Sequence, residues 1–492
     1  MTQFRQYKSF AAEPTSLTRR GFLRQTATVA LVAASGLPAF AGEDKVLLTV
    51  NSDDTRPQRV RVAVEVAGQM KMNPTGKELK YLPLSVTADL NFSQRRLPPI
   101  KETQLKDSAA VRLVRQYHTA ETKFNLKNNE FGQTLRDDRR LIVLQTEGDE
   151  GTFFSPLGPL TREELELVDV PGTGVLPELL LPGKELSVGD TWEVPTAAVV
   201  RLLSLDAVHK HDLIGKFDEI RDGILILSLE GKATGAIGGV SSEVNLKAKL
   251  NIDPKEQLLT WLAISLNENR AIGHAQPGYE VTTRIRILTA LGDAAPEISE
   301  TSLENLPLVA KTGETLIAFR SEKGGFELAH DRRWRVMSEK YDSAVLRLID
   351  RGELVSQCNI SKLKNFAKGE NLTLEAFQED VKAALEKQKG QIAEASQNTT
   401  DDGILVQKLL VTGSAAELPI QWTYYHLSDS EGRRASLVFT IDAKLVERYG
   451  HIDQELISAF TFFDPPMSVG EPTPAEDKAA VQSAKSKEPQ TK

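Results

Sequence analysis

Apolar and polar residues alternate along much of the first 290 residues. Four stretches show this alternation most clearly: 59–66, 82–92, 243–252 and 279–287. Residues two apart share a face of a β-strand, so each stretch predicts a strand with one buried and one solvated face. This pattern is typical of antiparallel sheets, because strands of parallel sheets are buried on both faces and show continuous apolar runs.

Helices are few in this region. Thr161-Arg162-Glu163-Glu164 predicts a capping box that starts a short helix. A second helix is expected over Thr196–Leu205, directly after Pro195. Residues 42–290 are therefore predicted to form an open antiparallel β half-barrel, an incomplete barrel with a few helices covering one face.

The pattern changes after a segment with little periodicity, residues 291–312, which we interpret as a linker. Residues 313–463 predict an α+β domain. Its expected strands are 315–319, 326–329, 344–349, 354–360, 405–411, 420–427 and 435–441. Thr373 is expected to cap a helix before the last three strands, and an apolar stripe over 445–460 predicts a final helix. Residues 464–492 lack aromatic side chains and predict a disordered tail.

The first 41 residues resemble a twin-arginine (Tat) export signal. Arg19 and Arg20 stand before Phe22 and Leu23, and the mildly apolar run 28–37 follows. Small residues, Ala39 and Ala41, occupy the −3 and −1 positions of a cleavage site before Gly42. The alternative is a membrane anchor, but the apolar run is too short to span a bilayer. The resemblance implies that the Tat translocase and signal peptidase act on the chain, and that the mature protein is periplasmic or secreted.

The charge of the chain excludes some partners. The 492 residues include 60 Lys and Arg against 68 Asp and Glu, a net charge of −8. Removal of residues 1–41 leaves 55 basic and 67 acidic residues, a net charge of −12. Nucleic acid and anionic membrane surfaces require basic faces, so neither is expected as the main partner. We also expect no membrane span in the mature chain.

The single cysteine, Cys358, excludes an internal disulfide. It alternates with Leu354 and Ile360, which predicts a buried, inert thiol on a strand. The alternative, a reactive thiol, would need a basic and exposed environment.

Motifs that carry chemistry are scarce, and we assign no catalytic residue and no cofactor. His209 and His211 are weak metal candidates, because residues two apart on a strand share a face, but no obvious third or fourth ligand stands nearby. The alternative is two partly exposed histidines at the start of a strand. Glu163, Glu164 and Glu166 suggest a pair of glycosidase acids, yet acids are favoured anyway in the first turns of a helix.

Two family resemblances add to this picture. Residues 313–463 resemble the PsbP/Mog-like fold on Phe326-Glu327-Leu328, Trp334-Arg335-Val336, the capped helix, the three-strand meander and Leu456–Phe462. Asp331 departs from the family, which commonly has a proline there. The resemblance implies an antiparallel sheet sandwiched by helices and a role in binding proteins. The turn Gly189-Asp190-Thr191-Trp192 faintly resembles LolA-like half-barrels and uncharacterised secreted bacterial proteins; half-barrels of this class hold acyl chains on a concave apolar face.

The sequence therefore predicts a secreted, non-enzymatic envelope protein that binds a protein partner or an apolar, lipid-like ligand. Two alternatives remain open. One is a hydrolase or metalloenzyme whose residues converge only in the folded chain. The other is a structural component of the envelope.

Overall fold

The structure, a computed structural model, describes residues 45–73, 78–99, 110–148, 150–293, 295–385, 390–415 and 417–464. The predicted export signal, with Arg19, Arg20, Phe22, Leu23, Ala39, Ala41 and Gly42, lies outside these residues, as does the predicted tail from residue 465. The described chain is mostly β-structure in antiparallel sheets, with few helices and no closed barrel, which confirms the predicted class. No helix within the described ranges is long and apolar enough to cross a membrane.

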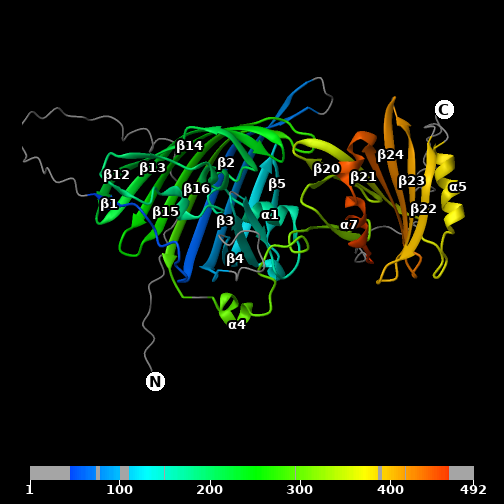
Figure 1. Cartoon of the computed structure of the whole chain (residues 1–492), viewed down its shortest axis with the longest axis horizontal. Helices are drawn as coiled ribbons and strands as arrows, with labels where there is room; N and C mark the ends of the chain where they lie inside the picture. The colour runs from blue at the N-terminus through cyan, green and yellow to red at the C-terminus, as the bar shows by residue number, and fades with distance from the viewer. Residues whose placement is uncertain are drawn as a thin grey trace, which may run out of the picture. The chain divides into compact units, whose positions relative to one another are not determined.

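The largest sheet has thirteen antiparallel strands. Strands from distant parts of the chain are neighbours in this sheet (Figure 1). The order across it is β10 (Thr191–Glu193), β12 (Ile214–Arg221), β13 (Ile224–Ile237), β14 (Val240–Asp253), β15 (Leu258–Arg270), β16 (Gly278–Leu291), β2 (Gln58–Met72), β3 (Lys80–Arg96), β4 (Val111–Leu126), β6 (Leu141–Glu147) and β7 (Glu150–Phe154), with β11 (Ala207–His211) on β13 and β5 (Asn129–Thr134) on β4. The four strands predicted from alternation are present as β2, β3, β14 and β16.

Three short helices pack against the apolar face of this sheet: α1 (Arg162–Val168), α2 (Pro177–Leu180) and α3 (Thr196–Leu202). The capping box at the start of α1 is confirmed, because Glu164 N donates to Thr161 Oγ1 (3.2 Å) and Thr161 N donates to a Glu164 carboxylate oxygen (2.9 Å). Side chains of α1 and α3 are buried in the same cluster as Leu90 of β3 and Leu250 of β14. The helices of the chain therefore fill much of the apolar face that the sequence analysis considered for a ligand.

The segment predicted as a linker packs on the large sheet. It contains a 3₁₀ turn (Pro296–Ile298) and α4 (Glu300–Leu303). Ile298 and Leu303 are buried with Val114 and Val143 in a small apolar cluster. From Lys45 onward the chain forms one compact unit.

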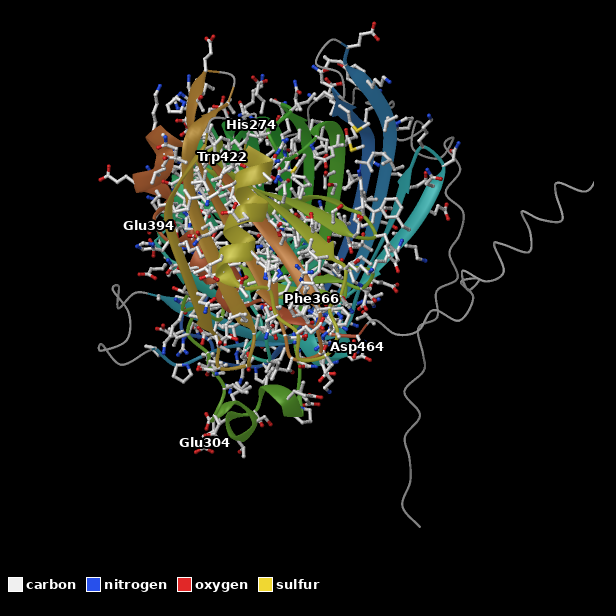
Figure 2. All side chains as sticks on the ribbon, turned by 90° about the vertical axis from the view of Figure 1, so that its right-hand side faces the viewer. His274, Glu304, Phe366, Glu394, Trp422 and Asp464 are labelled. Atoms are coloured by element: carbon white, nitrogen blue, oxygen red, sulfur yellow. The ribbon has the colours of Figure 1, made fainter. Side chains whose placement is uncertain are left out.

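The second large sheet has seven antiparallel strands. Their order is β19 (Trp334–Glu339), β20 (Ser343–Asp350), β21 (Glu353–Leu363), β25 (Arg434–Asp442), β24 (Leu418–Ser428), β23 (Leu405–Ala415) and β22 (Gln391–Thr399). Helix α5 (Leu374–Leu385) packs against Leu409, Val411 and Trp422. Figure 2 shows it beside Trp422. Helices α6 (Val446–Tyr449) and α7 (Ile452–Ser458) bury side chains with Leu346 and Cys358 in a separate cluster.

The structure differs from the sequence prediction at the final helix and at strand β22. The expected final helix is divided into α6 and α7 at Gly450, whose φ of 59° lies outside the right-handed helical region. Strand β22 was not predicted, because Gln391–Thr399 is almost wholly polar and shows no alternation. It pairs with β23 at the edge of the sheet, where most of its side chains are exposed.

A four-stranded sheet joins the two halves of the described chain. Its order is β26 (Thr461–Phe462), β18 (Phe326–His330), β17 (Ile317–Ser321) and β8 (Leu160–Thr161). Strand β8 pairs in parallel with β17, so Thr161 lies opposite Ala318. Because α1 starts at the next residue, this pairing brings Arg162 close to the segment that connects β18 to β19.

Candidate functional site

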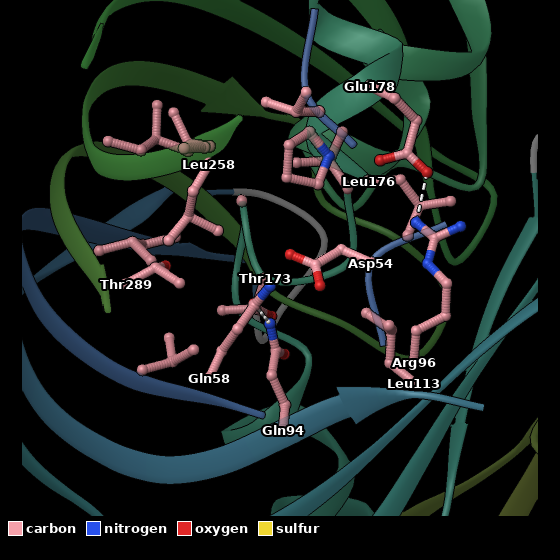
Figure 3. A pocket seen from close by; sticks show the side chains of 18 of the residues that line it. Asp54, Gln58, Gln94, Arg96, Leu113, Thr173, Leu176, Glu178, Leu258 and Thr289 are labelled. Carbon is pink, nitrogen blue, oxygen red and sulfur yellow. Dashed lines mark hydrogen bonds and ion pairs between the residues drawn. The ribbon is translucent and has the colours of Figure 1, made fainter. Parts of the chain in front are cut away.

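The first hollow is a small pocket against β2, β3 and β4, shown in Figure 3. Its volume is about 100 Å³, and its walls combine apolar side chains such as Val60 and Leu259 with the amides of Gln58 and Gln94. Gln94 Nε2 donates to Gln58 Oε1 at 2.9 Å. At its edge Arg96 binds Glu178 at 2.5 Å. A space of this size holds a few water molecules and no acyl chain.

A buried arginine also lines the small pocket. Arg115 is 3% exposed, and its guanidinium lies 4.8 Å from the centre of the Phe92 ring. Nε donates to Gln94 Oε1 (3.1 Å) and Nη2 donates to the carbonyl of Thr173 (2.6 Å). The bond to Thr173 connects β4 to the segment between α1 and α2, so it stabilises the position of the helices on the sheet.

The second hollow is larger, with a volume of about 790 Å³, and is called the cleft below. It is lined by residues of α1, the turn after α3, strands β14 to β16 and strands β17 to β19. Its apolar walls include Leu165, Leu203, Leu205, Ile237, Val244, Leu266, Ile317, Phe319 and Trp334. Its size lies within the range typical of small-molecule sites, and such sites are often found where two parts of a protein meet.

Besides Arg270 of β15, which is paired with Glu268, three arginines line the cleft: Arg162 at the start of α1, and Arg332 and Arg335 around the start of β19. Arg332 Nε donates to the carbonyl of Thr315 (2.8 Å) and its Nη2 donates to the carbonyl of Phe153 (2.5 Å). Burial lowers the pKa of all three guanidinium groups, that of Arg162 to about 10. The cleft therefore holds positive charge that is only partly solvated.

Acidic side chains line other parts of the cleft. Glu268 accepts hydrogen bonds from Ser242 Oγ (2.8 Å) and Arg270 Nε (2.7 Å). Burial raises the pKa of Asp169 to about 6, and its carboxylate accepts a hydrogen bond from Ser204 Oγ at 3.2 Å. Burial also raises the pKa of Glu166. Groups with shifted pKa values gather at functional sites more often than elsewhere, so these acids and arginines support the cleft as a site.

His330 contributes a neutral ring to the cleft. It is 3% exposed, and Nδ1 donates to the carbonyl of Asp331 at 2.8 Å. Burial lowers its pKa to about 4. Asp331 itself accepts hydrogen bonds from N and Nε of Arg333, both at 2.8 Å, and thereby fixes the turn before Trp334. The residue that departs from the PsbP/Mog-like pattern thus has a defined structural role here.

The weak metal candidates, His209 and His211, gain no further ligand in the structure. A bulge between Val208 and Lys210 breaks the alternation that the shared-face argument assumed. His211 Nε2 lies 3.0 Å from Thr196 Oγ1, and Leu213 N donates to Nδ1 at 3.4 Å. Within the described ranges, no group of three or more His, Cys, Asp or Glu side chains is placed to hold a metal ion.

The other sequence candidates are distributed over separate places. Glu163 and Glu166 line the cleft, whereas Glu164 is 1% exposed and binds Arg136, with Nε to Oε1 at 2.6 Å. Cys358 lies buried on β21, where burial raises its pKa well above the ordinary value. A thiol in that state is inert.

Sequence reasoning missed the grouping of Arg162, Arg332 and Arg335 in the cleft. The density of arginine at Arg332, Arg333 and Arg335 was a local signal. Its meaning depends on Arg162, which is 170 residues away in sequence and reaches the same place only because β8 pairs with β17. Alternation and capping patterns act within one element, so they could not identify this site.

No protein-family model matches the sequence, and no characterised protein matches it significantly in sequence. Among solved structures, the Saccharomyces cerevisiae Ran-binding protein Mog1p matches 30% of this chain and 96% of its own, at 12% identity and a TM-score of 0.24.

Two further structures are similar over larger parts of the chain. A Bacteroides thetaiotaomicron protein matches 34% of this chain and 56% of its own, at 12% identity and a TM-score of 0.22. A structure of lipovitellin with lipid–protein interactions matches 50% of this chain and 27% of its own, at 8% identity and a TM-score of 0.29. Likenesses of this strength carry no argument about function.

Proposed function

We propose that the mature chain is an exported, non-enzymatic envelope protein that binds a partly apolar small molecule in the cleft. In this proposal the N-terminal sheet is a half-barrel, the C-terminal part is a PsbP/Mog-like module, and the ligand lies where they meet. The observation that carries the proposal is the cleft of about 790 Å³, whose lining combines an apolar wall with four arginines and six acidic side chains. In small-molecule sites apolar contacts supply affinity and polar groups set orientation.

The location differs from the one that the half-barrel resemblance implies. Ligands of that class lie on the concave apolar face, but here α1, α2 and α3 are packed on the apolar face of the sheet. Leu180, Val199 and Leu202 are at most 1% exposed there. The small pocket against β2, β3 and β4 is too small for an acyl chain. The cleft is the larger of the two hollows and therefore the better candidate.

Titration with the neutral, apolar fluorescent probe N-phenyl-1-naphthylamine tests this proposal. We expect saturable binding at one site in the mature chain. Ala318 lines the cleft from β17, so Ala318→Trp should reduce probe affinity at least tenfold. Ala263 on β15 lies opposite Lys249 and Arg286 and does not line the cleft, so Ala263→Trp is the matched control.

Three results would count against the proposal. They are unsaturable binding, equal affinity in the two tryptophan variants, and a mass without adducts when protein purified from its native host is examined by native mass spectrometry. The last two together would favour the structural role. Circular dichroism and thermal melting of both variants would show that each is folded.

A further inference from the structure

Two guanidinium groups from distant parts of the chain meet in the cleft. Arg162 Nη2 donates to the carbonyl oxygens of Arg332 (2.6 Å) and Trp334 (3.4 Å). Arg335 Nη1 donates to the same two oxygens, and its distance to the Trp334 oxygen is 3.5 Å. Because both groups share one acceptor at hydrogen-bonding distance, their nitrogens lie within roughly 6 Å of each other.

Neither group is neutralised by contact with an acid. Among the described residues, no carboxylate oxygen lies within 4 Å of Arg162 or Arg335, whereas the neighbouring Arg333 binds Asp331 at 2.8 Å. Burial, followed by repulsion from Arg335, lowers the pKa of Arg162. Two like charges held this close in a partly buried place repel each other. An anion bound between or beside them would attract both and offset that repulsion.

The acids of the cleft do not take this role. Glu268 is bonded to Arg270, and Glu339 accepts a hydrogen bond from Ser321 Oγ at 2.7 Å. Glu166 attracts both arginines without touching either, Glu163 also attracts Arg162, and Asp206 and Asp331 also attract Arg335. An arriving anion therefore competes only with carboxylates that make no direct contact with either arginine.

The guanidinium pair also has apolar neighbours. Each guanidinium has five N–H donors in a planar fork, and the hydrogen bonds described above use one nitrogen of each. Leu165 lies one turn along α1 from Arg162, and Ile317 and Trp334 line the same cleft. A molecule with an anionic head and an apolar body would fit both kinds of lining.

We infer that Arg162 and Arg335 form an oxyanion-binding site, which takes the carboxylate or phosphate group of the ligand while its apolar body lies along the walls of the cleft. This inference rests on the proposed function for the location of the apolar body. The oxyanion part stands on the arginine geometry alone. Planar forks suit the oxygen spacing of carboxylate and phosphate groups, which explains the use of arginine at both positions.

Isothermal titration calorimetry with decanoate, 1-decanol and inorganic phosphate tests the site on the mature chain. For the wild type we expect decanoate to bind at least tenfold more tightly than 1-decanol. In the double variant Arg162→Gln/Arg335→Gln, decanoate affinity should fall at least tenfold while 1-decanol affinity stays within twofold. The matched control is Arg284→Gln, because Arg284 is an exposed arginine of β16 outside the cleft.

A second variant keeps the test decisive if the double variant does not fold. Arg335→Lys retains the charge and loses the fork, so decanoate affinity should fall severalfold while the thermal midpoint stays near that of the wild type. Equal decanoate affinity in wild type and in either folded variant would overturn the inference.

The three probes separate failure of the inference from failure of the proposed function. If 1-decanol binds as tightly as decanoate, the cleft is a ligand site but the oxyanion site is wrong. If phosphate binds in an arginine-dependent way and neither decyl compound binds, the oxyanion site is correct and the apolar ligand is wrong. If none of the three binds, both are wrong. Arginine-dependent binding of both decanoate and phosphate supports the inference, and the ratio of the two affinities shows whether a free anion suffices.

Discussion

Asp453 is the residue on which a buried polar network in the C-terminal part depends. It is 3% exposed, accepts a hydrogen bond from Tyr425 Oη at 2.6 Å, and forms an ion pair with Lys408 Nζ at 3.2 Å. Removal of one member of such a network leaves its partners buried without compensation, which costs more than the network itself contributes.

We therefore predict that Asp453→Ala lowers the free energy of unfolding by about 3 kcal/mol. Glu455, on the same helix but exposed, supplies the control, and Glu455→Ala should change it by less than about 0.5 kcal/mol. Urea denaturation followed by circular dichroism measures both. Similar costs for the two substitutions would show that the network contributes nothing specific.

His330 makes stability depend on pH. Burial lowers its pKa to about 4 in the folded chain, against about 6.5 in an unfolded chain. Between these values the unfolded chain binds the extra proton, so the contribution of His330 is fully present above about pH 6.5 and is lost as the pH falls toward 4.

For His330→Gln we predict a flatter dependence of the unfolding free energy on pH, with a difference of up to about 3 kcal/mol between pH 7 and pH 4. Some dependence should remain, because burial also lowers the pKa of His426 to about 4. Urea titrations at a series of pH values measure the effect. Parallel curves for variant and wild type would contradict it.

At the scale of elements, two hairpin turns contact each other, and each turn has a glycine at the point of contact. Gly239 lies in the turn between β13 and β14, and Gly352 lies in the turn between β20 and β21. A Cβ atom on Gly352 would lie 2.6 Å from the carbonyl oxygen of Gly239, so the two turns can approach only without side chains. The φ of Gly352 is +81°, a value that other residues rarely adopt.

Gly352→Ala should therefore destabilise the chain more than Gly223→Ala does. Gly223 has nearly the same φ, +80°, but no atom lies within 4 Å of the Cβ position, so both variants carry the backbone strain and only one carries the clash. We expect Gly352→Ala to lower the free energy of unfolding by about 1–3 kcal/mol more than Gly223→Ala does, as measured by thermal melting. Equal melting temperatures for the two variants would mean that the two turns can move apart without a loss of unfolding free energy.

Elements were also the level at which sequence reasoning worked best. The strand over Val240–Asp253 was predictable because its buried side chains, Val244 to Ile252, recur at every second residue. The capping box at Thr161 was predictable because it uses residues three apart. Strand β22 and the break at Gly450 were not, since a polar edge strand has no apolar face and a helical stripe continues across a break.

The candidate site was predictable only in part. Glu163 and Glu166 were noticed for their helix, but Arg162 and Arg335 acquire their role from strand pairing across 157 residues of chain, between Thr161 and Ala318. Neither alternation nor a local motif predicts contacts between residues so far apart in the sequence. The same limit applies to Arg115, whose burial depends on helices from a later part of the sequence.

For the whole molecule, Arg332 is one of the residues that connect the parts of the chain holding the two large sheets. Its guanidinium donates to Phe153, at the end of the thirteen-stranded sheet, and to Thr315, before β17. Hydrogen bonds from a charged donor to buried carbonyl groups contribute about 1.5–3 kcal/mol each.

Arg332→Ala is predicted to divide unfolding into two calorimetric transitions, where the wild type shows one. Arg333→Ala is the control: Arg333 forms a partly exposed ion pair with Asp331 and should cost less than about 1 kcal/mol. Differential scanning calorimetry distinguishes the outcomes. A single transition in both variants would show that the other contacts between the two sheets, the β8–β17 pairing among them, suffice to couple their unfolding.

The position of β2 in the large sheet has a consequence for the time at which the protein can fold. Strand β2 pairs with β3 on one side and with β16 on the other, so Gln58 lies opposite Leu291. The ribosome makes β2 more than 200 residues before its second neighbour, and contacts across such separations form slowly. The sheet therefore cannot complete its hydrogen bonding during the first half of synthesis, and its N-terminal strands must remain soluble as a nascent chain until β16 has emerged.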